Sequence, residues 1–426
     1  METIDELTAF LTTATVDGIL GRLLYRGAAW SLMREEGVLP PDAPPLGATI
    51  ETDLAEHGFA LLRGAMALRA RAGASELTSK AFERAANAFE ALVRNGDPNA
   101  PDRGFRRTIA AAAYHLAGFS AVAYSFFNEA AEDLNTSPGE TAIRQLILRD
   151  LDRLRGFVRD WLNEEAHGDE QIAKALRAED PDIDALLSTI LNTTICRALA
   201  FFDFALETGE DEPIETSRRM LATAVSLADD AANVPLWWLS NLCCHLIDDL
   251  WQHSLHQNLP TEPPEGAEER FPDLRRLFIA SLYARKTSEV ELWPSQREAA
   301  RRSTDVTDDL IVALPTSAGK TRVAEIAALM TLSSERRVLI VTPLRALSAQ
   351  TERSFRKTFA PLGFGVSSLY GASGLSVGDE DALRTREIII ATPEKLDFAL
   401  RSDASLIDDV GLIVVGGRAF SELGLH

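Results

Sequence analysis

The sequence predicts two parts with different folds: an acidic, mostly α-helical region over residues 1–265 and an α/β region with a parallel sheet over residues 291–426. A connecting helix or linker is expected between them, over residues 266–290. In the first part, apolar residues recur every three to four positions, which is typical of helices that bury one face. In the second part, short apolar runs alternate with helical patterns, which is typical of a parallel sheet covered by helices.

Helices are expected throughout the first part, separated by loops rich in Pro, Gly and Asn. These loop residues cluster at 40–45, 95–101, 135–139 and 260–266. The helical spacing is clearest over residues 54–71, 81–93, 108–117, 121–134, 143–162, 183–206, 218–231, 236–255 and 274–284.

Residues 111–130 resemble a tetratricopeptide unit, because the small residues Gly118, Ala121 and Ala130 alternate with aromatic ones. Small side chains at these positions let two helices pack closely. No regular 34-residue period is visible elsewhere. A tetratricopeptide-like unit and an ordinary helix hairpin therefore both remain open, and either one would offer a platform for a protein partner.

The formal net charge of −21 is distributed unevenly along the chain. Residues 286–426 contain 17 Lys and Arg and 19 Asp and Glu, so most of the acidic excess lies in the helical part. Nucleic-acid backbones are bound through positive charge. The charge distribution therefore argues against the helical part as a nucleic-acid platform and leaves the near-neutral α/β part as the candidate.

The chain has three cysteines, Cys196, Cys243 and Cys244. An odd number with one adjacent pair gives no disulfide framework, which fits a reducing cytoplasm. The first residues are acidic and lack the pattern of a signal peptide. No apolar run approaches the length of a membrane span, so we expect a cytoplasmic protein without a membrane partner.

Cys243, Cys244, His245, His253 and His256 are potential metal ligands that lie close together in the sequence. Structural zinc sites use paired ligands at closer spacings than these. Buried thiols and half-exposed histidines are therefore the expectation.

Four apolar runs in the second part are predicted to be strands: residues 310–314, 338–342, 388–392 and 410–415. Ligands of open parallel sheets bind at the carboxyl ends of the strands. Each of these runs is followed by a turn sequence or a helical pattern, so we expect the functional residues directly after the strands.

A phosphate-binding loop is predicted between the first of these runs and a helical pattern over residues 322–330. The segment Pro315-Thr-Ser-Ala-Gly-Lys-Thr321 would aim several backbone N–H groups and the positive end of the helix dipole at one point. Lys320 would reach the terminal phosphates, and the hydroxyl of Thr321 would bind Mg²⁺. Leu314 stands where the common loop pattern has its first glycine.

Pro315–Thr321 resembles motif I of superfamily 2 helicases, in which that glycine is typically absent. Three further segments follow in the order of the family. Residues 292–296 (Leu-Trp-Pro-Ser-Gln) resemble the Q-motif, residues 338–347 resemble motif Ia, and residues 387–397 resemble motif Ib. The motifs are most similar to the Ski-like branch, alongside the DEAD/DEAH-box families, and they cover only the last third of the chain.

The resemblance implies the first RecA-like domain of an ATP-dependent helicase, with ATP, Mg²⁺ and a single strand of DNA or RNA as ligands. It implies a nucleotide site in which Gln296 reads the adenine, formed by Gln296, Pro315, Thr316, Ser317, Ala318, Gly319, Lys320 and Thr321. It also implies a strand path along Pro343, Arg345, Thr392, Pro393 and Lys395. For Arg345 and Lys395 a solvated helix face is the alternative interpretation.

The sequence departs from the family after the run at 410–415, where motif II should read Asp-Glu-x-His. Here the chain reads Gly416-Gly-Arg-Ala-Phe420, so no carboxylate stands at either position and Arg418 brings the opposite charge. The resemblance therefore implies that no catalytic residue is intact and that the RecA-like domain is incomplete. We expect an N-terminal fragment that ends at a disrupted motif II and lacks the second RecA-like domain, because the earlier motifs are intact while everything after Val415 fails at once. A natural nucleotide-binding protein that has lost hydrolysis is the other interpretation.

The leading hypothesis for function is the ATP-binding and nucleic-acid-binding part of a superfamily 2 helicase, nearly inactive as an ATPase by itself. The alternative is a helical interaction or scaffold protein that carries a vestigial, non-hydrolysing nucleotide-binding module.

Overall fold

A computed structural model describes residues 3–16, 18–128, 136–302, 305, 309–313, 319–369 and 377–416. The chain divides into two compact units, Met1–Leu250 and Trp251–His426. The first is helical and the second contains a four-stranded parallel sheet. The predicted combination of a helical part and a partial α/β part is therefore confirmed.

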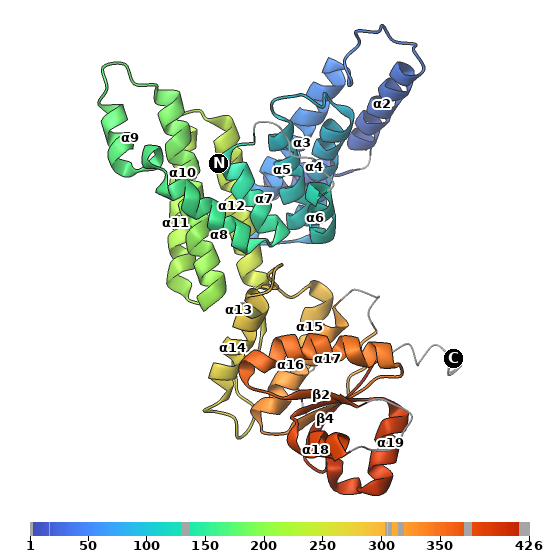
Figure 1. Cartoon of the computed structure of the whole chain (residues 1–426). Coiled ribbons are helices and arrows are strands. Elements are labelled where there is room, and N and C mark those ends of the chain that lie inside the picture. The colour runs from blue at the N-terminus through green and yellow to red at the C-terminus, as the bar shows by residue number, and fades with distance from the viewer. Residues whose placement is uncertain are drawn as a thin grey trace. The chain divides into compact units, whose positions relative to one another are not determined.

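The first unit is built from helices that pack mainly against their neighbours in sequence, as in the pairs α3/α4, α4/α5 and α10/α11 (Figure 1). Its elements are α1 (Ile4–Ala14), α2 (Gly18–Glu35), α3 (Ala48–Ala72), α4 (Glu76–Asn95), α5 (Arg103–Leu116), α6 (Ser120–Asn128), α7 (Pro138–Leu148), α8 (Leu151–Asn163), η1 (Glu165–His167), α9 (Asp169–Leu176), α10 (Ile183–Thr208), α11 (Asp211–Asp230) and α12 (Val234–His253).

The prediction of one helix over residues 143–162 is wrong, because α7 and α8 are separate helices. Arg149 ends α7 in the left-handed conformation, with a φ of 57°. Its guanidinium donates to the carbonyl oxygens of Leu146 at 2.7 Å and Ile147 at 3.2 Å, which would otherwise lack partners at the helix end. Asp150 then caps α8 by accepting the N–H of Arg153. The helical spacing of apolar residues continues across the break between α7 and α8, so the sequence pattern does not show it.

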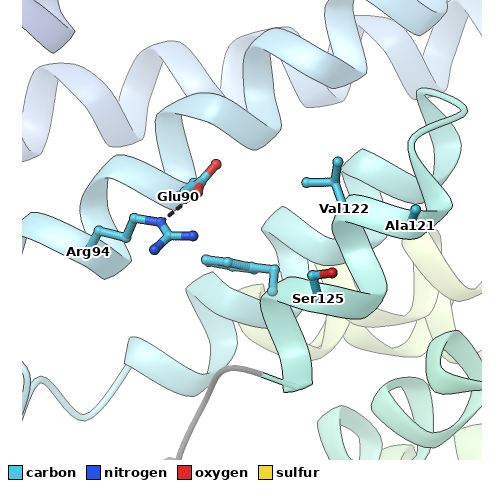
Figure 2. Close-up of a pocket in the computed structure, with 6 residues that line it drawn as sticks. Glu90, Arg94, Ala121, Val122 and Ser125 are labelled. Atoms are coloured by element: carbon cyan, nitrogen blue, oxygen red, sulfur yellow. Dashed lines mark hydrogen bonds and ion pairs between the residues drawn. The ribbon is translucent and has the colours of Figure 1, made fainter.

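The segment that resembles a tetratricopeptide unit forms a helix hairpin, in which α5 and α6 pack against each other and Gly118, with a φ of 90°, lies in the turn. Residues 129–134 of the expected second helix lie outside the described residues. A pocket of about 280 Å³ opens between α4 and α6. Figure 2 shows that Glu90 and Arg94 of α4 face Val122 and Ser125 of α6 across it, with the Glu90–Arg94 ion pair at 2.6 Å.

Helix α10 is long and apolar enough to cross a membrane by length and composition, but 44% of its most apolar window is buried inside the unit. It packs against α8 and α11. The three thiols are free, and Cys196 and Cys243 are buried. Burial raises the pKa of Cys244 to about 12. Within the described ranges, no three His, Cys, Asp or Glu side chains are grouped as a metal site would require.

Buried charged groups meet between α3, α5 and α12. Arg69 of α3 forms an ion pair with Asp249 of α12, and His115 Nε2 of α5 lies 3.4 Å from the second oxygen of Asp249. His245 lies one turn before Asp249. Burial, and then the positive charge of Arg69, lower the pKa of His245 to about 4, although Asp249 acts in the opposite direction.

The stability of this unit is expected to fall as the pH falls from 6.5 towards 4. The unfolded chain binds a proton at His245 near pH 6.5, whereas the folded chain resists protonation until about pH 4, so acid favours unfolding. The unfolding free energy of the native chain should fall between pH 7 and pH 5. In His245→Gln this fall should be smaller by about 2 kcal/mol. Urea unfolding at both pH values measures this, with His253→Gln as the control; equal losses in the native chain and His245→Gln would contradict it.

The second unit contains the parallel strands β1 (Arg337–Val341), β2 (Val366–Leu369), β3 (Ile388–Ala391) and β4 (Val410–Val415), in the order β2-β3-β1-β4. The strands predicted at 338–342, 388–392 and 410–415 are confirmed. The strand β2 was not predicted from the sequence.

Helices cover both faces of the sheet (Figure 1). Val338 and Ile340 of β1 join the core cluster on one face, which includes residues of α14 (Phe271–Tyr283), α16 (Lys320–Ser333) and α17 (Arg345–Phe359). Leu339 joins the cluster on the other face, with residues of α18 (Val377–Thr385), α19 (Pro393–Ser402) and η3 (Ala404–Ile407). The unit also contains α13 (Leu255–Asn258), α15 (Pro294–Arg302) and η2 (Ala360–Leu362). The predicted connecting segment contains α14, which packs against α16 and α17.

The strand predicted at residues 310–314 is not formed in its described part. Residues 309–313 have no strand structure, and Ile311 is 80% exposed. An apolar run becomes a strand only where a neighbouring strand takes up its backbone hydrogen bonds. This run satisfies the sequence pattern without that pairing. Leu314 lies outside the described residues.

Candidate nucleotide-binding site

The first turn of α16 presents two of the predicted site residues to solvent. Gly319 precedes the helix with a φ of 77°, in the left-handed region that favours glycine. Lys320 and Thr321 follow as the first two helical residues, and both are exposed. Backbone N–H groups at a helix start have no partner within the helix and attract anions. The other predicted loop residues, Pro315, Thr316, Ser317 and Ala318, lie outside the described residues.

The fold brings Gln296 against this helix start from 23 residues earlier in the chain. Gln296 in α15 is only 7% exposed. Its Oε1 accepts the N–H of Trp293 at 2.8 Å, and its Nε2 donates to the carbonyl oxygen of Gly319 at 3.4 Å. The resemblance implies that this amide reads adenine. In this structure both of its polar atoms bind protein groups, so Gln296 links α15 to Gly319, while Trp293 beside it is 46% exposed.

The two Thr-Pro turns lie next to each other at the carboxyl edge of the sheet. Val341 of β1 pairs in register with Ala391 of β3, and the turns follow these residues directly. Pro343 and Arg345 are exposed after β1, and Pro393 is exposed after β3. The sheet therefore brings together predicted strand-path residues that are about 50 positions apart in sequence.

Two of the predicted strand-path residues, Thr392 and Lys395, are buried, and so is Thr342 in the first of the two turns. The hydroxyl of Thr342 is buried and shares a hydrogen bond of 2.6 Å with Ser348 Oγ, so it serves the turn itself. Thr392 is also buried, and its N–H donates to Leu369 O at 3.3 Å. Lys395 is only 4% exposed, which fits neither a strand contact nor a solvated face. It lies one turn before Ala399, on the face of α19 that packs against the sheet.

Sequence reasoning missed a pair of buried charges in α16. Arg322 and Glu325 are both buried and form an ion pair with each other. Their spacing of three residues within an apolar helix was the available signal, since charged residues on a buried helix face need partners.

The residues predicted to depart from motif II, from Gly417 onward, lie outside the described residues. Gly416 itself donates its N–H to Val341 O at 2.8 Å.

The fold defines the class of this unit as an α/β domain with a four-stranded parallel sheet, and the sequence at residues 315–321 predicts a phosphate-binding loop after its first apolar run. Residues 293–416 match the family of DEAD/DEAH box helicases. The matched range contains Gln296, Lys320, Arg345 and Thr392. This match supports a superfamily 2 helicase domain; the Ski-like assignment remains a prediction.

Several curated proteins are similar to parts of this chain. Hachiman protein HamB of Bacillus cereus is 32% identical over 213 residues, which is 49% of this chain and 18% of that protein. ATP-dependent DNA helicase Hel308 of Pyrococcus abyssi is 38% identical over 130 residues, 29% of this chain and 17% of that protein. Hel308 of Thermococcus kodakarensis is 38% identical over 129 residues, 29% of this chain and 11% of that protein. The chain thus spans less than a fifth of the length of these relatives.

The similarity to HamB is longer than the α/β unit. An alignment of 213 residues is too long for Trp251–His426, so it includes part of the helical unit. The two Hel308 alignments are short enough to lie within the α/β unit.

Proposed function

We propose that the α/β unit is the ATP-binding and strand-binding part of an ATP-dependent superfamily 2 helicase. The observation that carries this proposal is the exposed Lys320–Thr321 pair at the start of α16, fixed beside Gly319 and Gln296, within the range that matches DEAD/DEAH box helicases. A positive side chain, a hydroxyl and a helix N-terminus together suit a polyphosphate with its Mg²⁺.

Each residue of the nucleotide site has a proposed role. Lys320 binds the terminal phosphates, and Thr321 is a ligand of the nucleotide's Mg²⁺. Pro315–Thr321 forms the loop around the phosphates, as its sequence predicts. Gln296 positions Gly319 through the contact described above.

The strand path is proposed to run over the two adjacent turns, with Pro343, Arg345 and Pro393 on its surface and Thr392 beneath. Hel308 is by name a DNA helicase, and DNA or RNA both remain candidates here. Arg345 supplies the exposed positive charge. Lys395 lies outside the proposed path, because its side chain is buried.

Hydrolysis by this chain is expected to be slow. Phosphoryl transfer depends on charges placed around the metal and the attacking water. The sequence after β4 reads Gly416-Gly-Arg-Ala-Phe420 and supplies no Asp or Glu there. We therefore propose nucleotide binding without efficient turnover.

The helical unit is proposed to bind a protein partner. Its acidic sequence argues against nucleic acid, and the similarity to HamB extends into it. This supports a role for the helical unit that is shared with HamB.

Strand binding by the full chain tests the proposed function. Labelled single-stranded DNA and RNA of one sequence are titrated with the chain at low salt, with and without ATP and Mg²⁺, and followed by fluorescence anisotropy. We expect at least one strand to bind and its dissociation constant to change when ATP is added. If neither strand binds, the helicase assignment fails and the chain is better described as an interaction protein.

Arg345→Ala is expected to weaken strand binding several-fold and to reduce the slope of log K against log salt by about 1, because one phosphate contact is lost. Arg353→Ala is the matched control, since Arg353 is exposed on the same helix, α17. Titrations at several salt concentrations measure both variants. Equal slopes for Arg345→Ala and the native chain would remove Arg345 from the strand path.

A further inference from the structure

A largely buried ionic network lies beside the first turn of α16. Arg322 follows Thr321 directly, and its side chain is only 8% exposed. Its guanidinium is paired on one side with Glu325 of the same helix, which is 1% exposed, and on the other side with Glu289 from the segment after α14. The residue next to the proposed Mg²⁺ ligand is therefore held by two carboxylates.

The network continues to α17. Glu325 Oε1 accepts hydrogen bonds from Ser354 Oγ at 3.2 Å and Thr358 Oγ1 at 2.9 Å. Arg285 donates to Thr358 Oγ1 at 2.6 Å and forms an ion pair with Glu289. Two positive and two negative groups thus balance each other, as burial of charge requires.

The backbone directly after Glu289 is hydrogen-bonded to another segment of the unit. Leu255 donates its N–H to Val290 O at 2.8 Å, and Leu292 donates its N–H to His253 O at 3.0 Å. Ser254 and Glu291 form the antiparallel bridge between these bonds. Residues 290–292 are therefore hydrogen-bonded to the segment that joins α12 and α13. These bonds fix the backbone next to Glu289, and its carboxylate pairs with Arg322 from this position.

The charge state of Glu289 fits this arrangement. Burial alone would raise the pKa of Glu289, but Arg322 and Arg285 lower it further than burial raises it, so its pKa lies below the ordinary value. The carboxylate is therefore ionised at neutral pH and pairs with both guanidinium groups.

We propose that Glu289 is a positioning residue for the phosphate site: through Arg322 it fixes the first turn of α16, so that Lys320, Thr321 and the backbone N–H groups are aligned for a triphosphate. Arg322 donates its own N–H to Gly319 O at 3.0 Å, which ties the anchored residue to the loop glycine. This inference rests on the proposed ATP site. Its consequence is that nucleotide affinity depends on a residue that does not itself touch the nucleotide.

The test compares Glu289→Gln with Glu335→Gln in the full chain. Glu335 is a matched control, because it also pairs with an arginine, Arg270, at 2.6 Å, but beyond the opposite end of α16. The dissociation constants of ATP and adenosine are measured in the presence of Mg²⁺, and the melting temperature of each variant is recorded. Glu289→Asp is the conservative variant, because it keeps the negative charge. The Glu289 side chain is 45% exposed, so the shorter aspartate has room to move towards Arg322.

We expect Glu289→Gln to weaken the binding of ATP about tenfold and to leave the binding of adenosine unchanged. In Glu289→Asp, most of the lost ATP affinity should be recovered. Glu335→Gln should bind ATP like the native chain. Native ATP affinity in Glu289→Gln, or an equal loss for ATP and adenosine, would overturn the positioning role while leaving the ATP site in place. If the native chain leaves ATP unbound, the proposed function fails and this inference fails with it.

Discussion

Lys320→Ala is expected to weaken ATP binding by about 100-fold or more. The exposed ammonium of Lys320 stands at the start of α16, where it would meet the terminal phosphates. Charge-assisted hydrogen bonds to phosphate are among the strongest in proteins, and no neighbouring backbone group can replace the lost charge. Because the side chain is exposed, its removal should leave the unfolding free energy nearly unchanged.

Fluorescent ATP titrated against the native chain and the variant measures this effect. Lys357→Ala is the control, since Lys357 is an exposed lysine of α17 in the same unit. Loss of affinity in both variants would indicate a general charge effect. Unchanged affinity in Lys320→Ala would show that the loop does not bind the phosphates.

Gly319→Ala is expected to abolish ATP binding and to destabilise the α/β unit. A Cβ atom on Gly319 would lie 1.7 Å from Gln296 Nε2, so Gln296 has to move. The φ of 77° adds about 1–2 kcal/mol for any residue with a Cβ. Displacement of Gln296 removes its hydrogen bonds to Trp293 and Gly319, which connect α15 to the start of α16.

Gly363→Ala separates the two causes of this loss. Gly363 has a φ of 90° but no atom within 4 Å of an added Cβ, so it reports backbone strain alone. The double variant Gly319→Ala/Gln296→Ala removes the clash and should be more stable than the sum of the single effects. Urea unfolding and ATP titration measure both properties. Additive effects would show that the side chain of Gln296 does not press on Gly319.

The sequence predicts much of the α/β fold because its strands are apolar runs between helical patterns. The strands β1, β3 and β4 follow this rule. The strand β2 does not, because Ser367 and Ser368 interrupt its four residues. The run at 310–313 has the right residues without a strand partner, which a local pattern cannot show.

The site is predictable where it is local. Lys320 and Thr321 follow from one loop sequence and lie at the start of the expected helix. The pairing of Arg322 with Glu289 is different, because it joins segments 33 residues apart that only the fold brings together. Burial of Lys395 likewise depends on which face of α19 meets the sheet.

Titration of the full chain with ATP and Mg²⁺ by calorimetry, with adenosine titrated beside it, tests the central claim most directly. We predict saturable binding of one ATP with a dissociation constant below about 1 mM and much weaker binding of adenosine, because the phosphates provide the contacts. A folded chain that binds neither ligand, or that binds both equally, would contradict the assignment of residues 315–321 as a phosphate-binding loop.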